Sequence, residues 1–475
     1  MRRSCLAAPV VAAMATVLSL AAAAPVQSAP AAAYDPAVSA PREDPYYPEK
    51  GDPSVDALHY GLRLQWSART RVLTGVARIH FRVPVAEDRV QLDLGEPLRV
   101  RSVRLDGEAT EFSHPGKDLV VETGPLAADS RHTLVVSYRG TPRPVDVPTN
   151  RSDTRTAGWT TTKRGEVWTM QEPFGAYSWY PVNDHPSDKA FYDARIVAPR
   201  GMVGVFNGKL VARRQASDGR TVTRWHLASP AASYLTTIAI GDYVRYRDRG
   251  PHGLPITYWL PRRDQRALPE LRRTPELIRW LERHLGRFPF DRIGAVVVPD
   301  SSAMETQTLV TVGRRLMSDR FLFRSVLLHE YAHQWYGDSV TPDSWPDLWL
   351  NESFAFYTEL RWQVSRGWTT MADVRAFLQS KDADLRAKDG PPGAYYPDHF
   401  AEQCVYLCGA LMLDRLSLRL GPALFAQVWR EWPQTHRNAS VDRTDYVAWL
   451  NQRTGQDLGP FMTEWLTSPT TPPTS

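Results

Sequence analysis

A change in hydrophobic period near residue 247 constrains the fold of this chain more than any other feature of its sequence. Between residues 56 and 246, apolar and polar residues alternate in short runs, which is typical of strands that bury one face. The inward positions of the two clearest runs are Tyr60, Leu62, Leu64 and Trp66, followed by Ala77, Ile79, Phe81 and Val83. Further strands are predicted at 98–105, closed by Asp106-Gly107, and at 133–138. Hairpin turns are predicted at Asn207-Gly208 and Asp218-Gly219.

Beyond a turn-rich stretch at 247–255, the apolar residues recur at helical spacing. One helix is predicted to begin with Thr274 as N-cap and Pro275 as first helical residue, and to end at Gly286. Others are predicted at 321–336, 346–366 and 406–420, with a short strand at 295–298. A chain of 475 residues is too long for one ordinary core. We therefore predict an α+β fold with an antiparallel β domain at 56–246 and a mainly α domain at 247–466.

The two ends of the chain differ in composition from these domains. Arg2 and Arg3 precede an apolar stretch at 6–24 and small residues at 29–33, the pattern of a signal peptide. A membrane anchor is the alternative, but the stretch is short and dominated by Ala. We expect residues 1–33 to be a signal peptide and processing region, so that the mature protein is secreted without a stable membrane anchor. Residues 34–55 and 467–475 are expected to be flexible tails.

Charge and cysteine content exclude some classes of protein. The formal net charge of +5 is small for this length and no dense Lys/Arg run occurs, so nucleic-acid binding has little support. After signal cleavage Cys404 and Cys408 remain. Two cysteines do not form a disulfide framework, and their spacing fits one helical face, where an unstrained disulfide is awkward. Whether they are bonded stays open at this point.

The sequence His329-Glu330-Tyr331-Ala332-His333 lies within the helix predicted at 321–336. A four-residue step places both imidazoles on one helical face, where they can bind one metal ion, and Glu330 can reach a water molecule bound to that metal. Two surface histidines on an ordinary helix are the alternative. The surrounding residues are apolar, so the helix should be buried, and buried ionisable groups are costly unless they are paired or bound to metal.

Glu352 follows His333 after eighteen residues, enough for one helix to end and the next to begin. It is the candidate third protein ligand of a Zn²⁺ site with its fourth position open for water or substrate. Asp347, Asn351 and Glu359 are candidates for orienting the imidazole N–H groups. For each of these three, a solvated or capping side chain is an equally good interpretation.

Longer motifs around these residues resemble the gluzincin aminopeptidases, the family of aminopeptidase N and the leukotriene hydrolase. The resemblance covers nearly the whole mature chain. It rests on the segments 329–338 (HEYAHQWYGD), 349–355 (WLNESFA), 179–186 (WYPVNDHP) and 286–291 (GRFPFD). It implies a saddle-like β domain followed by a thermolysin-like catalytic domain. Most family members continue into a long C-terminal helical domain, so this chain resembles a short, two-domain form.

The resemblance also implies roles for individual residues. His329, His333 and Glu352 would bind a single Zn²⁺, Glu330 would act as general base and Tyr406 would assist the transition state. Segment 302–306 (SAMET) stands where the family has its Gly-Ala-Met-Glu-Asn motif, so Glu305 would bind the substrate's α-amino group. Ser302 and Thr306 depart from that motif, which puts contacts to the substrate backbone in doubt. Glu172 matches a second amine-binding position, contributed by the β domain.

The predicted function is that of a secreted zinc metalloaminopeptidase acting on peptides with a free N-terminus through a zinc-activated water. Three alternatives remain: an endopeptidase on the same scaffold, an epoxide hydrolase using the same zinc, and a non-catalytic secreted binding protein. The complete set of ligands and base disfavours the last of these. Oligomeric state and side-chain preference have no sequence signal that we can identify.

Overall fold

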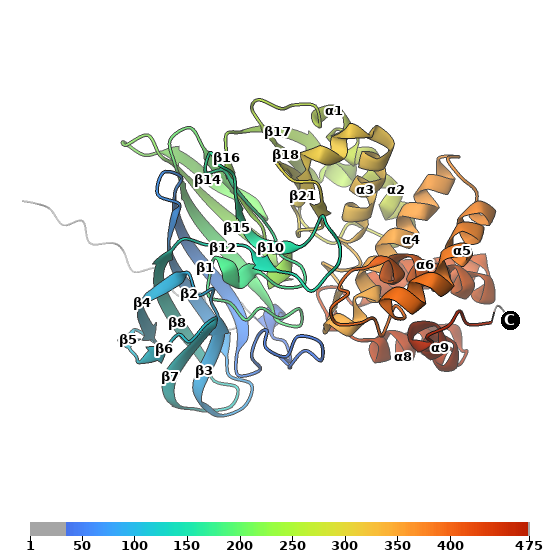
Figure 1. Cartoon of the computed structure of the whole chain (residues 1–475), viewed down its shortest axis with the longest axis horizontal. Helices are drawn as coiled ribbons and strands as arrows, with labels where there is room; N and C mark the ends of the chain where they lie inside the picture. The colour runs from blue at the N-terminus through green and yellow to red at the C-terminus, as the bar shows by residue number, and fades with distance from the viewer. Residues whose placement is uncertain (1–34, 474–475) are drawn as a thin grey trace, which may run out of the picture.

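The structure is a computed structural model that describes residues 35–473. The predicted signal peptide at 1–33 lies outside the described residues. Strands dominate the first half of the chain and helices the second, side by side with their junction near the middle of the molecule (Figure 1). The predicted α+β class is confirmed. Among helices of the described residues, none combines the length and apolar character needed to cross a bilayer.

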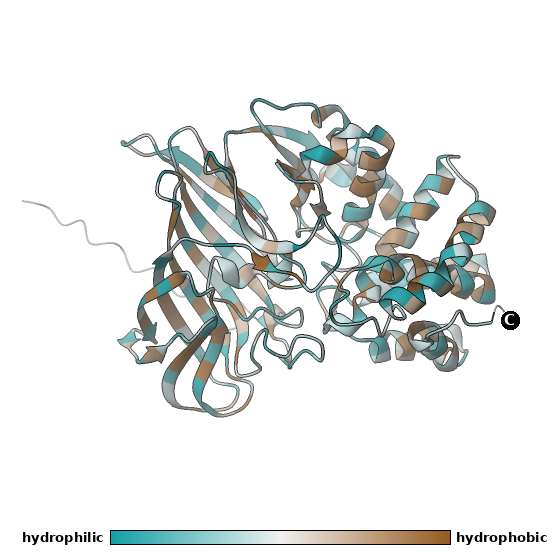
Figure 2. Cartoon of the chain, viewed as in Figure 1, coloured by the Kyte–Doolittle hydropathy of each residue, from teal (hydrophilic) through white to brown (hydrophobic). Residues whose placement is uncertain are grey.

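The largest sheet has the strand order β14-β15-β12-β1-β2-β8-β4-β5. Its strands are β1 (Asp56–Ser67), β2 (Val72–Arg82), β4 (Leu98–Leu105), β5 (Glu108–Ala109), β8 (Arg131–Gly140), β12 (Lys189–Ala198), β14 (Lys209–Gln215) and β15 (Thr221–Ala232). The predicted alternation is confirmed, since the inward residues of β1 and β2 are buried and hydrophobic colour alternates along the strands (Figure 2). The sheet is not wholly antiparallel: β1 and β12 run parallel, and the long segment between them in sequence provides the crossover that parallel neighbours require.

Two smaller sheets complete the β-rich half. One has the order β13-β16-β11-β10-β9 and the other β3-β7-β6. Their strands are β3 (Glu87–Asp93), β6 (Phe112–Ser113), β7 (Asp118–Leu126), β9 (Val145–Asp146), β10 (Thr156–Thr161), β11 (Val167–Met170), β13 (Val203–Phe206) and β16 (Ile238–Gly241).

One of the two predicted hairpins is present. Asp218-Gly219 joins β14 to β15, which pair. The hairpin predicted at Asn207-Gly208 is wrong, because β13 and β14 enter different sheets. The Asn207 side chain instead accepts a hydrogen bond from the Thr237 N–H and donates to two buried carbonyls.

A mixed sheet of order β17-β18-β19-β21-β20 adjoins the helices. Its strands are β17 (Tyr243–Arg249), β18 (Pro255–Pro261), β19 (Ile293–Val298), β20 (Ala303–Met304) and β21 (Val310–Gly313). The predicted strand at 295–298 is confirmed within β19. The domain boundary predicted between 246 and 247 falls inside β17, which is hydrogen-bonded to β18.

The helices form the second half of the molecule. They are α1 (Leu268–Leu271), α2 (Thr274–Leu285), α3 (Arg320–Ala332), α4 (Trp349–Ser365), α5 (Met371–Asp389), α6 (Gln403–Leu420), α7 (Pro422–Thr435), α8 (Arg443–Thr454) and α9 (Gly459–Thr467). The short pair β22 (Thr341–Pro342) and β23 (Ser440–Val441) joins α8 to the loop after α3. Short 3₁₀ turns are η2 (Ala176–Ser178), η3 (Ser233–Leu235), η4 (Pro251–Gly253), η5 (Arg314–Ser318) and η6 (Trp345–Asp347).

The helices predicted at 346–366 and 406–420 are present with ends shifted by up to three residues, and two other helix ends differ in kind. Thr274 is not an N-cap: it lies inside α2, and its hydroxyl contacts the Leu271 carbonyl and the Tyr331 hydroxyl. The helix predicted at 321–336 ends at Ala332, because the chain turns back before Gly337, whose φ of 124° suits glycine. Gly286 does end α2, as predicted.

The structure corrects the prediction for residues 34–55 and shows whether Cys404 and Cys408 are bonded. The segment predicted as a flexible tail at 34–55 packs against both halves. Its Asp52 N–H donates to Asn183 of the β-rich half, and its buried Asp44 accepts a hydrogen bond from the Trp345 N–H of the helical half at 2.7 Å. Tyr47 also donates to the Pro397 carbonyl. Cys404 and Cys408 are joined by a disulfide on α6, which answers the question that their spacing left open.

Candidate active site

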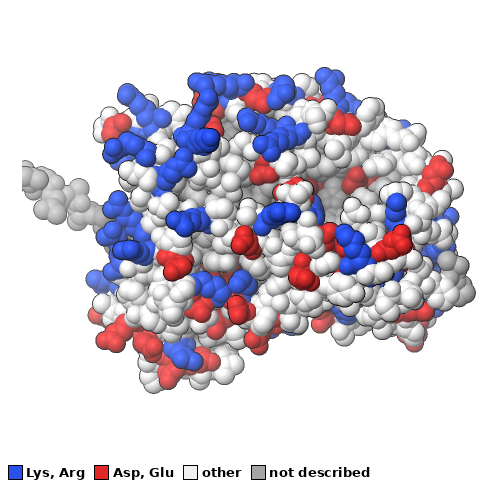
Figure 3. All heavy atoms as spheres, viewed as in Figure 1, with Lys and Arg blue, Asp and Glu red and all other residues white. Residues whose placement is uncertain are grey.

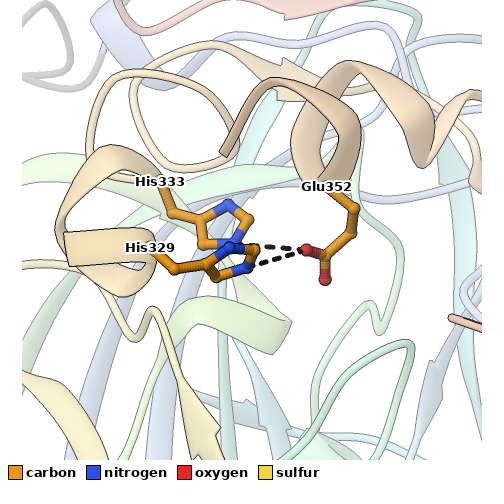
Figure 4. A group of neighbouring side chains, drawn as sticks. All are labelled: His329, His333 and Glu352. Carbon is orange, nitrogen blue, oxygen red and sulfur yellow. Dashed lines mark hydrogen bonds and ion pairs between the residues drawn. The ribbon is translucent and has the colours of Figure 1, made fainter. Parts of the chain in front are cut away.

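The end of α3 and the first turn of α4 bring the three predicted metal ligands together. His329 lies in the last turn of α3, His333 is the residue that caps it, and Glu352 lies in the first turn of α4. Glu352 Oε2 is 3.2 Å from His329 Nε2 and 3.3 Å from His333 Nε2. All three side chains point at one spot (Figure 4). Their ligand atoms lie within 4.8 Å of one another, the arrangement of a three-ligand metal site.

The other imidazole nitrogens show that a cation fits between these residues. His333 Nδ1 lies 3.1 Å from the Tyr336 carbonyl oxygen, and His329 Nδ1 lies 3.4 Å from Glu359 Oε2. Each ring thus faces an acceptor through both nitrogens, and a neutral imidazole has one N–H to offer. With that N–H on Nδ1, both Nε2 atoms direct a lone pair toward Glu352 Oε2, so three electron-rich atoms face one another. A divalent cation among the three atoms satisfies them all, and two imidazoles with one carboxylate suit Zn²⁺.

The groups that hold the imidazoles were predicted only in part. Of the three candidates, Glu359 faces an imidazole. Asp347 does not, since it accepts from the Trp349 indole and from Arg443. Asn351 does not face an imidazole either, because its amide N–H groups contact Glu172 and Glu305. The Tyr336 carbonyl was missed, and no side-chain pattern could have indicated a backbone acceptor.

Glu330 lies beside the predicted metal ligands and is almost fully buried, with 6% of its surface exposed. A carboxylate oxygen of Glu330 lies within 4.8 Å of a ligand atom of His333 and of Glu305. Burial raises the pKa of Glu330 to about 8, although both histidines oppose that shift. The group is therefore suited to take up and release a proton near neutral pH.

Two more carboxylates share one hydrogen-bond donor next to this cluster. Asn351 Nδ2 lies 3.1 Å from Glu305 Oε1 and 3.3 Å from Glu172 Oε1. Glu305 follows β20 and Glu172 follows β11, so the helical and β-rich halves each contribute one. Burial, then the charge of Glu305, raises the pKa of Glu172 well above its usual value. A cationic group between the two carboxylates would lower that electrostatic cost.

The two residues that depart from the family motif lie on either side of Glu305. Thr306 is fully buried, and its hydroxyl contacts the Leu309 carbonyl and the Thr311 hydroxyl. Ser302 borders the cavity, with its hydroxyl 3.5 Å from Asp153. Thr306 therefore supports the local backbone, whereas Ser302 is placed to contact a ligand.

Tyr406, on α6, faces the same cluster. Its hydroxyl donates to Glu352 Oε1 at 2.9 Å and accepts from Arg151 Nη1 at 3.1 Å. Burial, then the charge of Glu352, raises the pKa of this phenol well above its usual value, so it stays protonated. Arg151 could not be predicted from the sequence, because nothing in the loop around it forms a motif.

These groups line one cavity of about 290 Å³ at the junction of the two halves. The surface is hollowed near the centre of the view in Figure 3, with acidic atoms at the rim. Apolar side chains form part of the wall, among them Trp168, Met304, Phe356 and Phe400. The lining therefore combines ionisable and apolar side chains.

Comparison with known families agrees with this geometry. The model of the "Peptidase M1 N-terminal domain" matches residues 56–235, and that of the "Peptidase family M1 domain" matches residues 270–465. Together they cover both the β-rich half and the metal-ligand cluster.

Curated relatives and solved structures point the same way. The chain is 24% identical to the "Probable aminopeptidase 1" of Saccharolobus solfataricus over 83% of this chain and 51% of the relative. It is 24% identical to human "Glutamyl aminopeptidase" over 86% of this chain and 46% of the relative. The chain thus spans about half the length of these curated relatives.

A solved mutant M1 zinc metallopeptidase from Deinococcus radiodurans, bound to a Tyr-Ser-Ala substrate, superposes with a TM-score of 0.79. It is 25% identical to this chain, and the match covers 90% of this chain and 98% of that one.

Proposed function

The chain belongs to peptidase family M1, and we propose that it is a zinc-dependent aminopeptidase that removes residues from the free N-terminus of peptides. One observation carries the exopeptidase part of the proposal. Two carboxylates, the half-buried Glu172 and the buried Glu305, meet at the Asn351 amide beside the predicted zinc ligands. A substrate's α-ammonium supplies the positive charge that this pair lacks.

His329, His333 and Glu352 hold a single zinc ion in this proposal. Bound there, zinc supplies Lewis-acid polarisation of the scissile carbonyl and lowers the pKa of water. Glu330 takes the proton from the attacking water and delivers it to the leaving amine, which its raised pKa permits.

Tyr406 donates its hydroxyl proton to the oxyanion that forms on the scissile carbonyl. In the structure this proton points to Glu352 Oε1, so the hydroxyl rotates away from Glu352 when substrate is attacked. Glu172 and Glu305 bind the ammonium and thereby place the first peptide bond, rather than a later one, beside Glu330.

A panel of aminoacyl-coumarin substrates, assayed with and without a chelator, tests this function. We expect turnover that disappears with the chelator and returns with zinc. N-acetylated versions of the same substrates should be inert, because acetylation removes the charge that the two carboxylates bind. Efficient internal cleavage of an acetylated peptide would favour the endopeptidase alternative, and turnover of an epoxide alone would favour the hydrolase.

Export of the mature chain also belongs to the proposal. It is supported by the pattern of residues 1–33, which lie outside the described part of the chain. N-terminal sequencing of protein recovered from the culture medium tests it, and retention of full-length protein inside the cells would contradict it.

A further inference from the structure

A loop of the β-rich half crosses to the helix that carries Tyr406. This loop, residues 147–155, joins β9 to β10. The Phe400 N–H donates to the Pro148 carbonyl at 2.8 Å, and the Asn150 N–H donates to Glu402 Oε1 at 2.9 Å. The loop is therefore anchored to the chain just before α6 through its own backbone, independently of Arg151.

Arg151 extends from this anchored loop, and its guanidinium has a fixed direction. Nε and Nη2 donate to the two oxygens of Asp153 at 3.2 and 2.8 Å. Nη1 donates to the Ala401 carbonyl and to the Tyr406 hydroxyl, each at 3.1 Å. Four of the five N–H donors of the guanidinium are thus engaged, and one of them ends on the Tyr406 oxygen.

The contact has a chemical consequence for Tyr406. A phenol has one proton, and its oxygen can accept while that proton is donated elsewhere. Because Arg151 holds the oxygen from one side, the O–H can rotate toward a ligand while the oxygen stays in place. As the proton is shared with an oxyanion, negative charge builds on the phenol oxygen, and an adjacent guanidinium stabilises that charge.

We propose that Arg151 is a positioning residue for Tyr406, so that the β-rich half of the chain completes the oxyanion site of the helical half. The inference rests on the proposed function, in which Tyr406 serves the oxyanion. Capture of the substrate's own carboxylate is a weaker use of Arg151, because Asp153 already neutralises the guanidinium and one N–H is left.

A double-mutant cycle with Tyr406→Phe tests the inference. Arg151→Met should lower kcat about 10- to 100-fold with little change in KM, because the contact matters when the oxyanion forms. In the Tyr406→Phe background, Arg151→Met should lower kcat by less than about threefold, because the residue that Arg151 positions has lost its hydroxyl. Arg151→Lys should recover part of kcat. Arg155→Met is the matched control, because Arg155 is an exposed arginine of the same loop, and it should leave kcat unchanged.

Affinity for a phosphinic pseudodipeptide, which imitates the tetrahedral intermediate, gives a readout that does not depend on turnover. The affinity of the Arg151→Met enzyme for this inhibitor should fall by about the same factor as kcat. Its affinity for the product amino acid should stay constant, and so should its zinc content. If Arg151→Met lowers kcat equally in the wild type and in the Tyr406→Phe background, the inference is overturned. It is also overturned if Arg151→Met only raises KM, and does so for peptides with a free C-terminal carboxylate but not for peptide amides. Wild-type turnover in the same assay tests the proposed function separately.

Discussion

At the scale of single residues, carboxylates outnumber cationic side chains in the lining of the cavity. Three buried carboxylates, Glu305, Glu330 and Glu352, lie close to the half-buried Glu172. Arg151, with its own partner Asp153, is a cationic neighbour of this group on the cavity wall. Buried carboxylates without counter-charge are costly, so the fold holds them for ligands that bring positive charge. In the proposed function, a divalent metal would account for one site and a substrate ammonium for the other.

The amine site makes a first prediction. Glu305→Gln should raise KM and lower kcat together, because a peptide held by one carboxylate is poorly placed for attack. Steady-state kinetics on aminoacyl-coumarins checks this, and the variant should lose its discrimination between free and N-acetylated substrates. Unchanged kinetics would show that Glu305 does not bind the amine.

His185 makes a second prediction, about pH. Its Nδ1 accepts from the Ser187 N–H, and its buried Nε2 has no hydrogen-bond partner among residues 35–473. Burial lowers the pKa of the ring to about 3. The unfolded chain binds a proton near pH 6.5, so stability is lost as the pH falls from about 6.5 toward 3. Between pH 6.5 and 5 the unfolding free energy should drop by up to about 2 kcal/mol more than in His185→Phe. Parallel curves from urea unfolding would contradict this.

Side chains in motifs could be predicted from the sequence, whereas partners without a motif could not. The structure brings the predicted residues Glu172, Glu305 and Tyr406 to one cavity although they are distant in sequence. The Tyr336 carbonyl is a backbone atom, and Arg151 meets Tyr406 across 255 positions. Neither contact follows from local periodicity, because both depend on how the two halves pack.

Close packing of α4 against α6 determines the site at the scale of elements. Ser353, next to Glu352, donates to the Val405 carbonyl, next to Tyr406, at 2.6 Å. Gly409 permits this approach, since a Cβ there would lie 1.8 Å from Ser353 Oγ. The sequence predicted that these two helices exist, but which of their faces meet depends on such contacts between distant residues.

This packing makes a third prediction. Gly409→Ala should destabilise the protein by about 1–3 kcal/mol through overpacking, and should lower kcat by displacing Tyr406 from Glu352. Adding Ser353→Gly removes the clashing hydroxymethyl group and should recover part of both losses. Denaturant unfolding and kinetics on the two variants check this, and a Gly409→Ala protein with normal stability and kcat would show that the helices can separate freely.

At the scale of the whole molecule, the β-rich half and the helical half each supply part of the cavity. The helical half holds the predicted metal ligands and Glu305, whereas the β-rich half supplies Glu172 and Arg151. The change of hydrophobic period predicted both halves. The parallel pairing of β1 with β12 and the packing of residues 44–47 onto the helical half were not predictable, because each depends on contacts between distant segments.

Metal binding should be visible in the stability of the whole chain, which is a fourth prediction. Zinc binds the folded cluster and not the dispersed ligands of the unfolded chain. At free zinc about 100-fold above its dissociation constant, the folded state should gain about 2.7 kcal/mol, which raises the melting temperature. His329→Ala should show no such rise, and a wild-type melt that does not respond to zinc would contradict the metal site.

The most direct test of the central claim measures zinc content and turnover together in Glu330→Gln. Glutamine keeps the size of the side chain and leaves His329, His333 and Glu352 intact, but it cannot take a proton from water. We predict one zinc per chain, as in the wild type, with kcat reduced by at least about a hundredfold. Full turnover in a zinc-loaded Glu330→Gln protein would contradict the account, as would turnover in a wild type that binds no zinc.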